Sequence, residues 1–131
     1  MIKFKYTIIY VADVQQTLAF FEQAFQMTIR FITPENDYGE LDTGETTLAF
    51  ASHSLGALNF DGGYVSCTDS SKPLGTEIAL VTDDIHATHA AAITHGAQAL
   101  KAPESKPWGQ TISYVRCPSG ILIELCTPVS Q

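Results

Sequence analysis

The strongest constraint on the fold is a pattern that occurs twice along the chain. The sequence VADV at 11–14 resembles VTDDI at 81–85, and YG at 38–39 resembles WG at 108–109. Gly44 and Gly120 occupy matching turn positions. Self-similarity of this kind indicates two structurally equivalent units. We therefore expect one supersecondary module, built twice.

The first half of the chain predicts a strand, a helix and three further strands. Segments rich in β-branched and aromatic residues, separated by turn residues, are typical of strands. Asp13 stands where an N-cap is expected, with Gln16 as its capping-box partner. Apolar residues then recur at helical spacing at Val14, Leu18 and Phe21. The expected strands cover residues 4–11, 27–33, 38–42 and 46–52, with the helix after the first.

The second half predicts the same order of elements. Asp83 or Asp84 caps a helix that runs to His95, and Gly96 follows as a left-handed C-cap. A strand–helix–strand crossover places the helix on one face of the sheet, so the other face is left free. The expected strands cover residues 77–82, 98–102, 111–117 and 121–127.

The length of 131 residues predicts a single domain. Its N-terminal module covers residues 1–52, its C-terminal module residues 76–128, and residues 53–75 link them. This linking loop is rich in Gly and Ser but carries embedded apolar residues. A loop this long in a small domain is usually functional or mobile, and it serves either as a flap beside a ligand or as an inert tether.

The charge balance argues against nucleic acid as a partner. Fourteen acidic residues against seven basic ones give a net charge of −7, which leaves no cationic face for phosphates. No window approaches the ~20 apolar residues of a membrane span, and the N-terminal segment does not resemble a signal peptide. The three cysteines form no CxxC pair, so we expect them reduced in a cytoplasmic protein.

One carboxylate in the last strand is the most informative single residue. Ile121, Ile123 and Leu125 share one face of that strand, and Leu122, Glu124 and Cys126 share the other. A lone carboxylate in an apolar run is costly if it is buried without a partner. Either this face is wet, or Glu124 binds something. Glu77, with Ala79 and Val81 on its face, is either a second site residue or a surface charge at a strand end.

The doubled βαβββ unit and the hairpin RCPSGILIEL at 116–125 resemble the vicinal oxygen chelate superfamily. This superfamily contains glyoxalase I, extradiol dioxygenases, fosfomycin-resistance enzymes and bleomycin-binding proteins. The resemblance implies an α+β fold of two tandem βαβββ modules whose sheets curl around a cup. It also implies a homodimer, which would cover exposed sheet edges.

The resemblance implies four metal-ligand positions, two in each module, and this chain fills them poorly. They fall on Tyr6, on Leu48 or Ala49, on Glu77 and on Glu124. A catalytic metal typically keeps about three protein ligands, with imidazole favoured. The two carboxylates leave at best an oxygen-rich site for magnesium or manganese. We therefore expect no cofactor, or a weakly bound divalent metal ion.

The leading functional hypothesis is recognition of a small organic molecule in the cup without a tightly bound metal. The residues expected to line it are Tyr6, Tyr10, Leu48, Phe50, Trp108 and Cys126. The competing hypothesis is a glyoxalase-like lyase or isomerase, in which Glu77 and Glu124 form an acid–base pair or hold a weak metal. A module that binds only other proteins is the third class. The histidines of the second helix, His86, His89 and His95, are expected to be structural or solvated.

Overall fold

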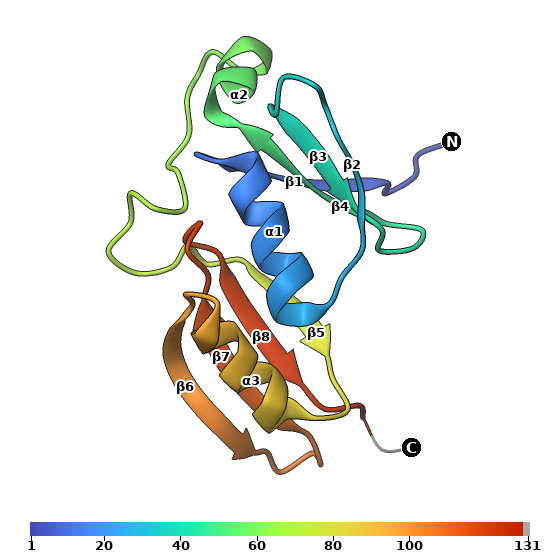
Figure 1. Cartoon of the computed structure of the whole chain (residues 1–131), viewed down its shortest axis with the longest axis vertical. Helices are drawn as coiled ribbons and strands as arrows, with labels where there is room; N and C mark the ends of the chain where they lie inside the picture. The colour runs from blue at the N-terminus through green and yellow to red at the C-terminus, as the bar shows by residue number, and fades with distance from the viewer. Residues whose placement is uncertain (130–131) are drawn as a thin grey trace. The chain divides into compact units, whose positions relative to one another are not determined.

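The computed structural model describes residues 1–129 and divides into two compact units, one of residues 1–66 and one that begins at Cys67. Each unit holds a four-stranded sheet with a helix against one face (Figure 1). The described residues form three helices and eight strands. This α+β architecture of two βαβββ repeats confirms the predicted fold class.

The sheet of the first unit has the strand order β1-β4-β3-β2. Its strands are β1 (Tyr6–Val11), β2 (Ile29–Ile32), β3 (Tyr38–Leu41) and β4 (Thr47–Ser52). β1 pairs with β4 in parallel, and the other pairs are antiparallel. The helix α1 (Val14–Phe25) makes the crossover from β1 to β2 and packs against the sheet.

The core of the first unit lies between α1 and the sheet. Phe21 of α1 is fully buried and stacks on Phe50 of β4, with ring centroids 5.3 Å apart. Gly39 of β3 lies directly under Leu18, and a Cβ at this position would overlap the leucine side chain. The close approach of α1 to β3 therefore depends on a glycine.

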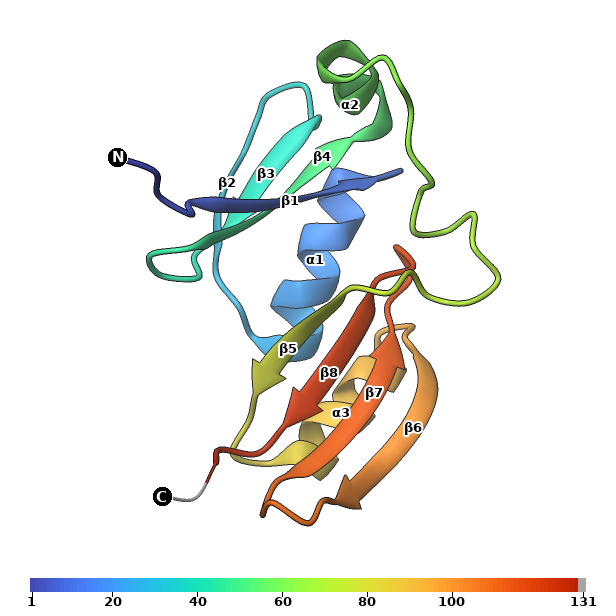
Figure 2. The same ribbon diagram turned by 180° about the vertical axis from the view of Figure 1, so that it is seen from behind.

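The second unit repeats this topology with the strand order β5-β8-β7-β6. Its strands are β5 (Glu77–Val81), β6 (Gln98–Ser105), β7 (Thr111–Arg116) and β8 (Leu122–Cys126). The helix α3 (Ile85–Thr94) covers one face, and Figure 2 shows the sheet from the opposite face. β5 pairs with β8 in parallel, as β1 pairs with β4.

The two crossover helices begin with the same hydrogen bonds. Asp13 Oδ1 accepts from the Gln16 backbone N–H at 2.9 Å, and Asp84 Oδ1 accepts from Ala87 N–H at 3.1 Å. Side-chain acceptors of this kind satisfy backbone N–H groups that lack a partner in the first turn. The predicted caps are confirmed, and Asp84 rather than Asp83 caps the second helix.

The predicted linking loop contains a helix that the sequence analysis missed. This helix, α2 (His53–Asn59), is capped by Ser52, whose Oγ accepts from Leu55 N–H at 3.1 Å. It spans only two turns, too few for an apolar period to stand out. The strand predicted over residues 98–102 is longer in the structure, where β6 continues to Ser105. No helix within residues 1–129 is long and apolar enough to cross a membrane.

Candidate functional site

The sheet face of the second unit that lies away from α3 carries the two carboxylates singled out in the sequence. Ile123 and Leu125 point toward α3 and are fully buried, so the alternation of β8 places Glu124 on the opposite face. The strand register brings Ala79 of β5 and Tyr114 of β7 beside Glu124. We call this surface the acidic sheet face, and its members are Glu77, Ala79, Val81, Ile112, Tyr114, Arg116, Leu122, Glu124 and Cys126.

Glu77 and Glu124 influence each other on this face. Burial, and then the charge of Glu124, raise the pKa of the Glu77 carboxyl above its usual range. Tyr114 Oη donates a hydrogen bond to Glu124 Oε1 at 3.0 Å. Burial and this contact raise the pKa of Tyr114 to about 12, so the phenol stays protonated and remains a donor. Together, Glu77, Glu124 and Tyr114 can hold or move a proton, or bind a ligand that is cationic or donates hydrogen bonds.

The corresponding face of the first sheet carries several aromatic side chains. Alternation places Tyr6, Ile8 and Tyr10 on it, and Tyr6 and Ile8 are both more than 40% exposed, at 49% and 44%. The register sets Ala49 and Ala51 of β4 beside Ile8 and Tyr10. We call this surface the aromatic sheet face, and its members are Tyr6, Ile8, Tyr10, Phe31, Tyr38, Glu40, Thr47, Ala49 and Ala51.

A buried carboxylate on the aromatic sheet face was missed by the sequence analysis. Glu40 is only 7% exposed, and it accepts from Tyr38 Oη at 2.7 Å and pairs with Arg30 Nη1 at 3.3 Å. Burial and the contact with Glu40 raise the pKa of Tyr38 strongly. The signal was present, because Tyr38 and Glu40 are two residues apart in a strand and therefore share a face.

Two predicted ligand-binding residues lie in the core instead. Phe50 is fully buried and stacks on Phe21 of α1, and Leu48 shares its face of β4. Leu48 and Phe50, which were predicted to line a ligand site, therefore lie on the α1 side of the sheet and not on the aromatic sheet face. A shift of one residue exchanges the two faces of a strand, and Ala49 is the residue of β4 beside Ile8 on the aromatic sheet face.

The remaining predicted residues take different positions. Cys126 lies on the acidic sheet face, but burial and then Glu124 raise the pKa of its thiol, which disfavours a nucleophilic thiolate. Trp108 lies in the turn between β6 and β7, is 59% exposed, and its Nε1–H donates to Gln110 Oε1 at 2.7 Å. Tyr10 stacks against Tyr64 from the segment after α2.

One histidine of α3 has a structural role. His89 Nδ1 lies 3.0 Å from Ser113 Oγ, and Ser113 is fully buried on the α3 side of β7. Burial lowers the pKa of His89, so its ring stays neutral near pH 7. This hydrogen bond ties α3 to the sheet, away from the acidic sheet face.

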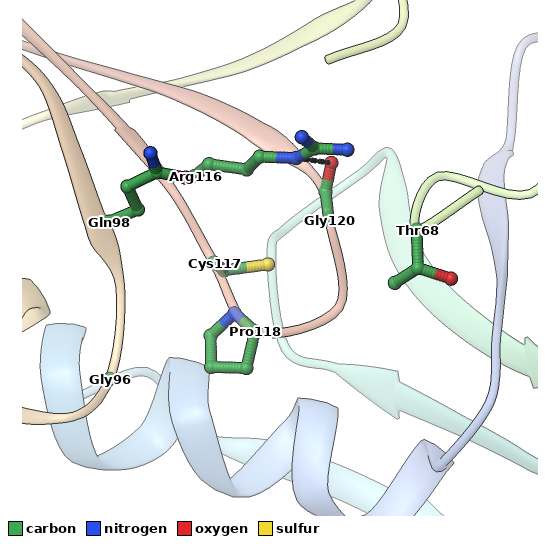
Figure 3. A pocket seen from close by; sticks show the side chains of 7 residues that line it. All are labelled: Thr68, Gly96, Gln98, Arg116, Cys117, Pro118 and Gly120. Atoms are coloured by element: carbon green, nitrogen blue, oxygen red, sulfur yellow. Dashed lines mark hydrogen bonds between the residues drawn. The ribbon is translucent and has the colours of Figure 1, made fainter. Parts of the chain in front are cut away.

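A pocket of about 280 Å³ lies at the turn between β7 and β8 (Figure 3). Arg116 borders it, but the guanidinium is already held by backbone carbonyls. Its nitrogens donate to the carbonyl oxygens of Cys67 at 2.6 Å, Ser70 at 2.9 Å and Gly120 at 3.1 Å. Arg116 thus anchors the start of the second unit to its hairpin. The cysteines that flank this region, Cys67 and Cys117, are free, as is Cys126.

The fold and the open sheet faces define a glyoxalase-like protein of tandem βαβββ modules. The chain belongs to the Glyoxalase/Bleomycin resistance protein/Dioxygenase superfamily, whose model matches residues 3–125. No curated protein sequence matches the chain.

Several solved structures share this fold. A glyoxalase/bleomycin resistance protein/dioxygenase family enzyme from Burkholderia phytofirmans PsJN has a TM-score of 0.78 and 18% identity, covering 96% of this chain and 98% of its own. A glyoxalase-related enzyme from Fulvimarina pelagi has a TM-score of 0.80 and 16% identity, with 98% and 89% covered. A superfamily member from Sphaerobacter thermophilus DSM 20745 has a TM-score of 0.67 and 23% identity, with 98% of both chains covered.

The donor set of this chain does not fit the metal site that the resemblance implies. With the register of β4 established, the four positions hold Tyr6, Ala49, Glu77 and Glu124. Alanine offers no ligand atom, and the set contains no imidazole. Within residues 1–129, no group of three or more His, Cys, Asp or Glu side chains is placed to hold a metal ion. This donor set does not fit a tight catalytic metal site of the usual kind, and the expectation of no cofactor or a weakly bound divalent ion stays a prediction.

Proposed function

We propose that this protein binds a small organic molecule on its open sheet faces without requiring a tightly bound metal. The observation that carries the proposal is the acidic sheet face, where Glu77 and Glu124 stand together among apolar side chains. Within residues 1–129, neither carboxylate forms an ion pair with a lysine, arginine or histidine. Small-molecule sites combine an apolar lining with a few convergent polar groups, and the acidic sheet face offers residues of both kinds.

The charge on this face favours a particular ligand chemistry. Two neighbouring carboxylates repel each other, and a cationic or hydrogen-bond-donating group placed on them relieves this repulsion. The surrounding Ala79, Val81 and Leu122 offer apolar contact. A ligand with a polar donor attached to an apolar body matches both features.

Thermal-shift screening against metabolites and drugs, with and without a chelator, tests the proposal. A ligand at a hundred times its Kd stabilises the folded state by about 2.7 kcal/mol. We expect binders whose shift is unchanged by the chelator and is reduced in Glu77→Gln and Glu124→Gln. Glu22→Gln, which changes an exposed carboxylate on α1, is the matched control and should leave the shift intact. Binders whose thermal shift is the same in both site variants as in the unsubstituted protein would contradict the assignment of the site.

A second candidate function is proton transfer by the same two carboxylates. The raised pKa of Glu77 supports it, because a carboxyl that keeps its proton nearer neutral pH suits general acid–base work. Each ligand with a C–H next to a carbonyl should be incubated with the protein in D2O and followed by NMR. Deuterium uptake that is lost in Glu77→Gln but kept in Glu22→Gln would support proton abstraction by Glu77, the step that a lyase or isomerase of this kind requires. Binding with no exchange would leave recognition alone.

A further inference from the structure

We infer that the ring face of Tyr10 is a slot for a planar aromatic ligand bearing a hydroxyl, and that Tyr64 fills this slot from within the chain. The inference deepens the proposed function and rests on it, because Tyr10 belongs to the aromatic sheet face. It names the chemical class of ligand, a phenol, and the residue that competes with it.

The contact between the two tyrosines has the geometry of ligand stacking. The ring centroids of Tyr10 and Tyr64 are 4.8 Å apart and the ring planes differ by 23°. Aromatic pairs prefer such separations, with offset rings. Tyr64 follows α2, so an aromatic ring from outside the sheet already lies flat on Tyr10.

The polar end of the slot is supplied by α2. His53 Nδ1 lies 2.8 Å from Tyr64 Oη, within hydrogen-bond distance. Burial, and then the neighbouring Tyr10, raise the pKa of Tyr64, so its phenol is protonated. A hydroxyl on a bound ring would meet the same imidazole nitrogen.

The wall of the slot requires a residue without a side chain. A Cβ on Gly56 of α2 would lie 2.8 Å from Tyr64 Oη and 3.0 Å from ring carbons of Tyr10. Such distances are below ordinary van der Waals contact, so α2 comes this close only because position 56 is a glycine. The site therefore has a floor at Tyr10, a wall at Gly56 and a polar terminus at His53.

Tyr64 is held by contacts that an external ligand can replace. It is 40% exposed, and the structure has no helix or strand between α2 and β5. A free phenol could replace both contacts of Tyr64, because it can stack on Tyr10 and form one hydrogen bond with His53. Tyr64 therefore acts as an internal competitor that lowers the apparent affinity for such ligands.

The test compares p-cresol, which matches the tyrosine side chain, with 4-methylcyclohexanol, which has the same substituents on a saturated ring. We expect p-cresol to bind Tyr64→Ala at least tenfold more tightly than the unsubstituted protein, as measured by calorimetry or NMR titration. The control is Phe60→Ala, which removes a 54% exposed ring from the same segment and should leave the affinity unchanged. In Tyr64→Ala, 4-methylcyclohexanol should bind at least tenfold more weakly than p-cresol.

Equal p-cresol affinity with and without Tyr64, or equal binding of the two probes, would overturn the inference. If Tyr64→Ala does not fold, hydrogen exchange on the unsubstituted protein decides. Saturating p-cresol should then speed amide exchange in residues 60–66, and unchanged exchange would contradict displacement of Tyr64. A screening ligand whose binding depends on Glu77 and Glu124, together with p-cresol binding that is the same with and without Tyr64, would leave the proposed function standing and remove this inference alone.

Discussion

At the scale of single residues, each sheet face carries a tyrosine–glutamate hydrogen bond, and the two glutamates differ in how deeply they are buried. Glu40 is almost fully buried and needs the Tyr38 hydroxyl at 2.7 Å, whereas Glu124 is only partly buried beside Tyr114. Removing the hydrogen-bond donor of a buried carboxylate costs about 1.5–3 kcal/mol, because water cannot reach the carboxylate to replace the lost donor. We expect Tyr38→Phe to lower the free energy of unfolding by about 2 kcal/mol, and Tyr114→Phe by clearly less. Urea denaturation of both variants checks this order, and equal losses would contradict it.

The pKa of Glu77 provides a second test at the same scale. Burial raises this pKa, and the Glu124 charge raises it further. Glu124→Gln removes that charge, so we expect the pKa of Glu77 to move down toward 4.5, the ordinary value. NMR titration of the side-chain carboxyl measures the shift, and Glu22→Gln should leave it in place. An unchanged or higher pKa in Glu124→Gln would show that the two groups do not interact as described.

This raised pKa also sets the sign of a stability effect. The folded state holds the Glu77 proton more tightly than the unfolded state does. The contribution of Glu77 is therefore fully present below pH 4.5, its unfolded value, and is lost as the pH rises through the folded pKa. Glu124→Gln should make this loss smaller in the same pH window.

At the scale of elements, two hairpin glycines form a natural matched pair. Gly44 has a φ of +87° and Gly120 a φ of +86°, so both are in the left-handed region. A Cβ on Gly44 meets nothing within 4 Å, whereas one on Gly120 would lie 2.5 Å from the carbonyl oxygen of Cys67. We expect Gly44→Ala to cost about 1 kcal/mol of stability, as the left-handed conformation alone does. Gly120→Ala should cost more and should loosen the segment held by Arg116, as measured by urea denaturation and amide exchange; equal costs would contradict this account.

The sequence predicted elements well where one local rule decides. The cap at Asp13 follows from residue type and position alone, and the second cap was narrowed to Asp83 or Asp84, of which Asp84 forms it. The short helix α2 was missed, because two turns carry too little periodicity. The face of Leu48 was undecidable for a different reason: β4 is apolar on both faces, so alternation carries no information there. Contacts between distant residues, such as Arg30 with Glu40 or Tyr10 with Tyr64, depend on strand register and chain tracing, which local patterns do not encode.

At the scale of the whole molecule, the repeat preserved architecture while the two sheet faces diverged. Both units keep the strand order, the parallel outer pair and the helix cap. On the open faces, however, Tyr6 stands where the second unit has Glu77, and Ala49 where it has Glu124. Both units therefore keep the superfamily fold, but the two carboxylates at the expected metal-ligand positions, Glu77 and Glu124, both lie in the second unit.

The central claim, recognition of an organic ligand without a tight metal, is tested most directly by calorimetric metal titration. Chelator-stripped protein should be titrated with nickel, zinc, manganese and iron(II), in parallel with Glu124→Ala. We predict binding that is absent or weaker than micromolar for every metal, because the site lacks two of the usual donors. Stoichiometric binding tighter than about micromolar, worth roughly 8 kcal/mol, and lost in Glu124→Ala would contradict the account.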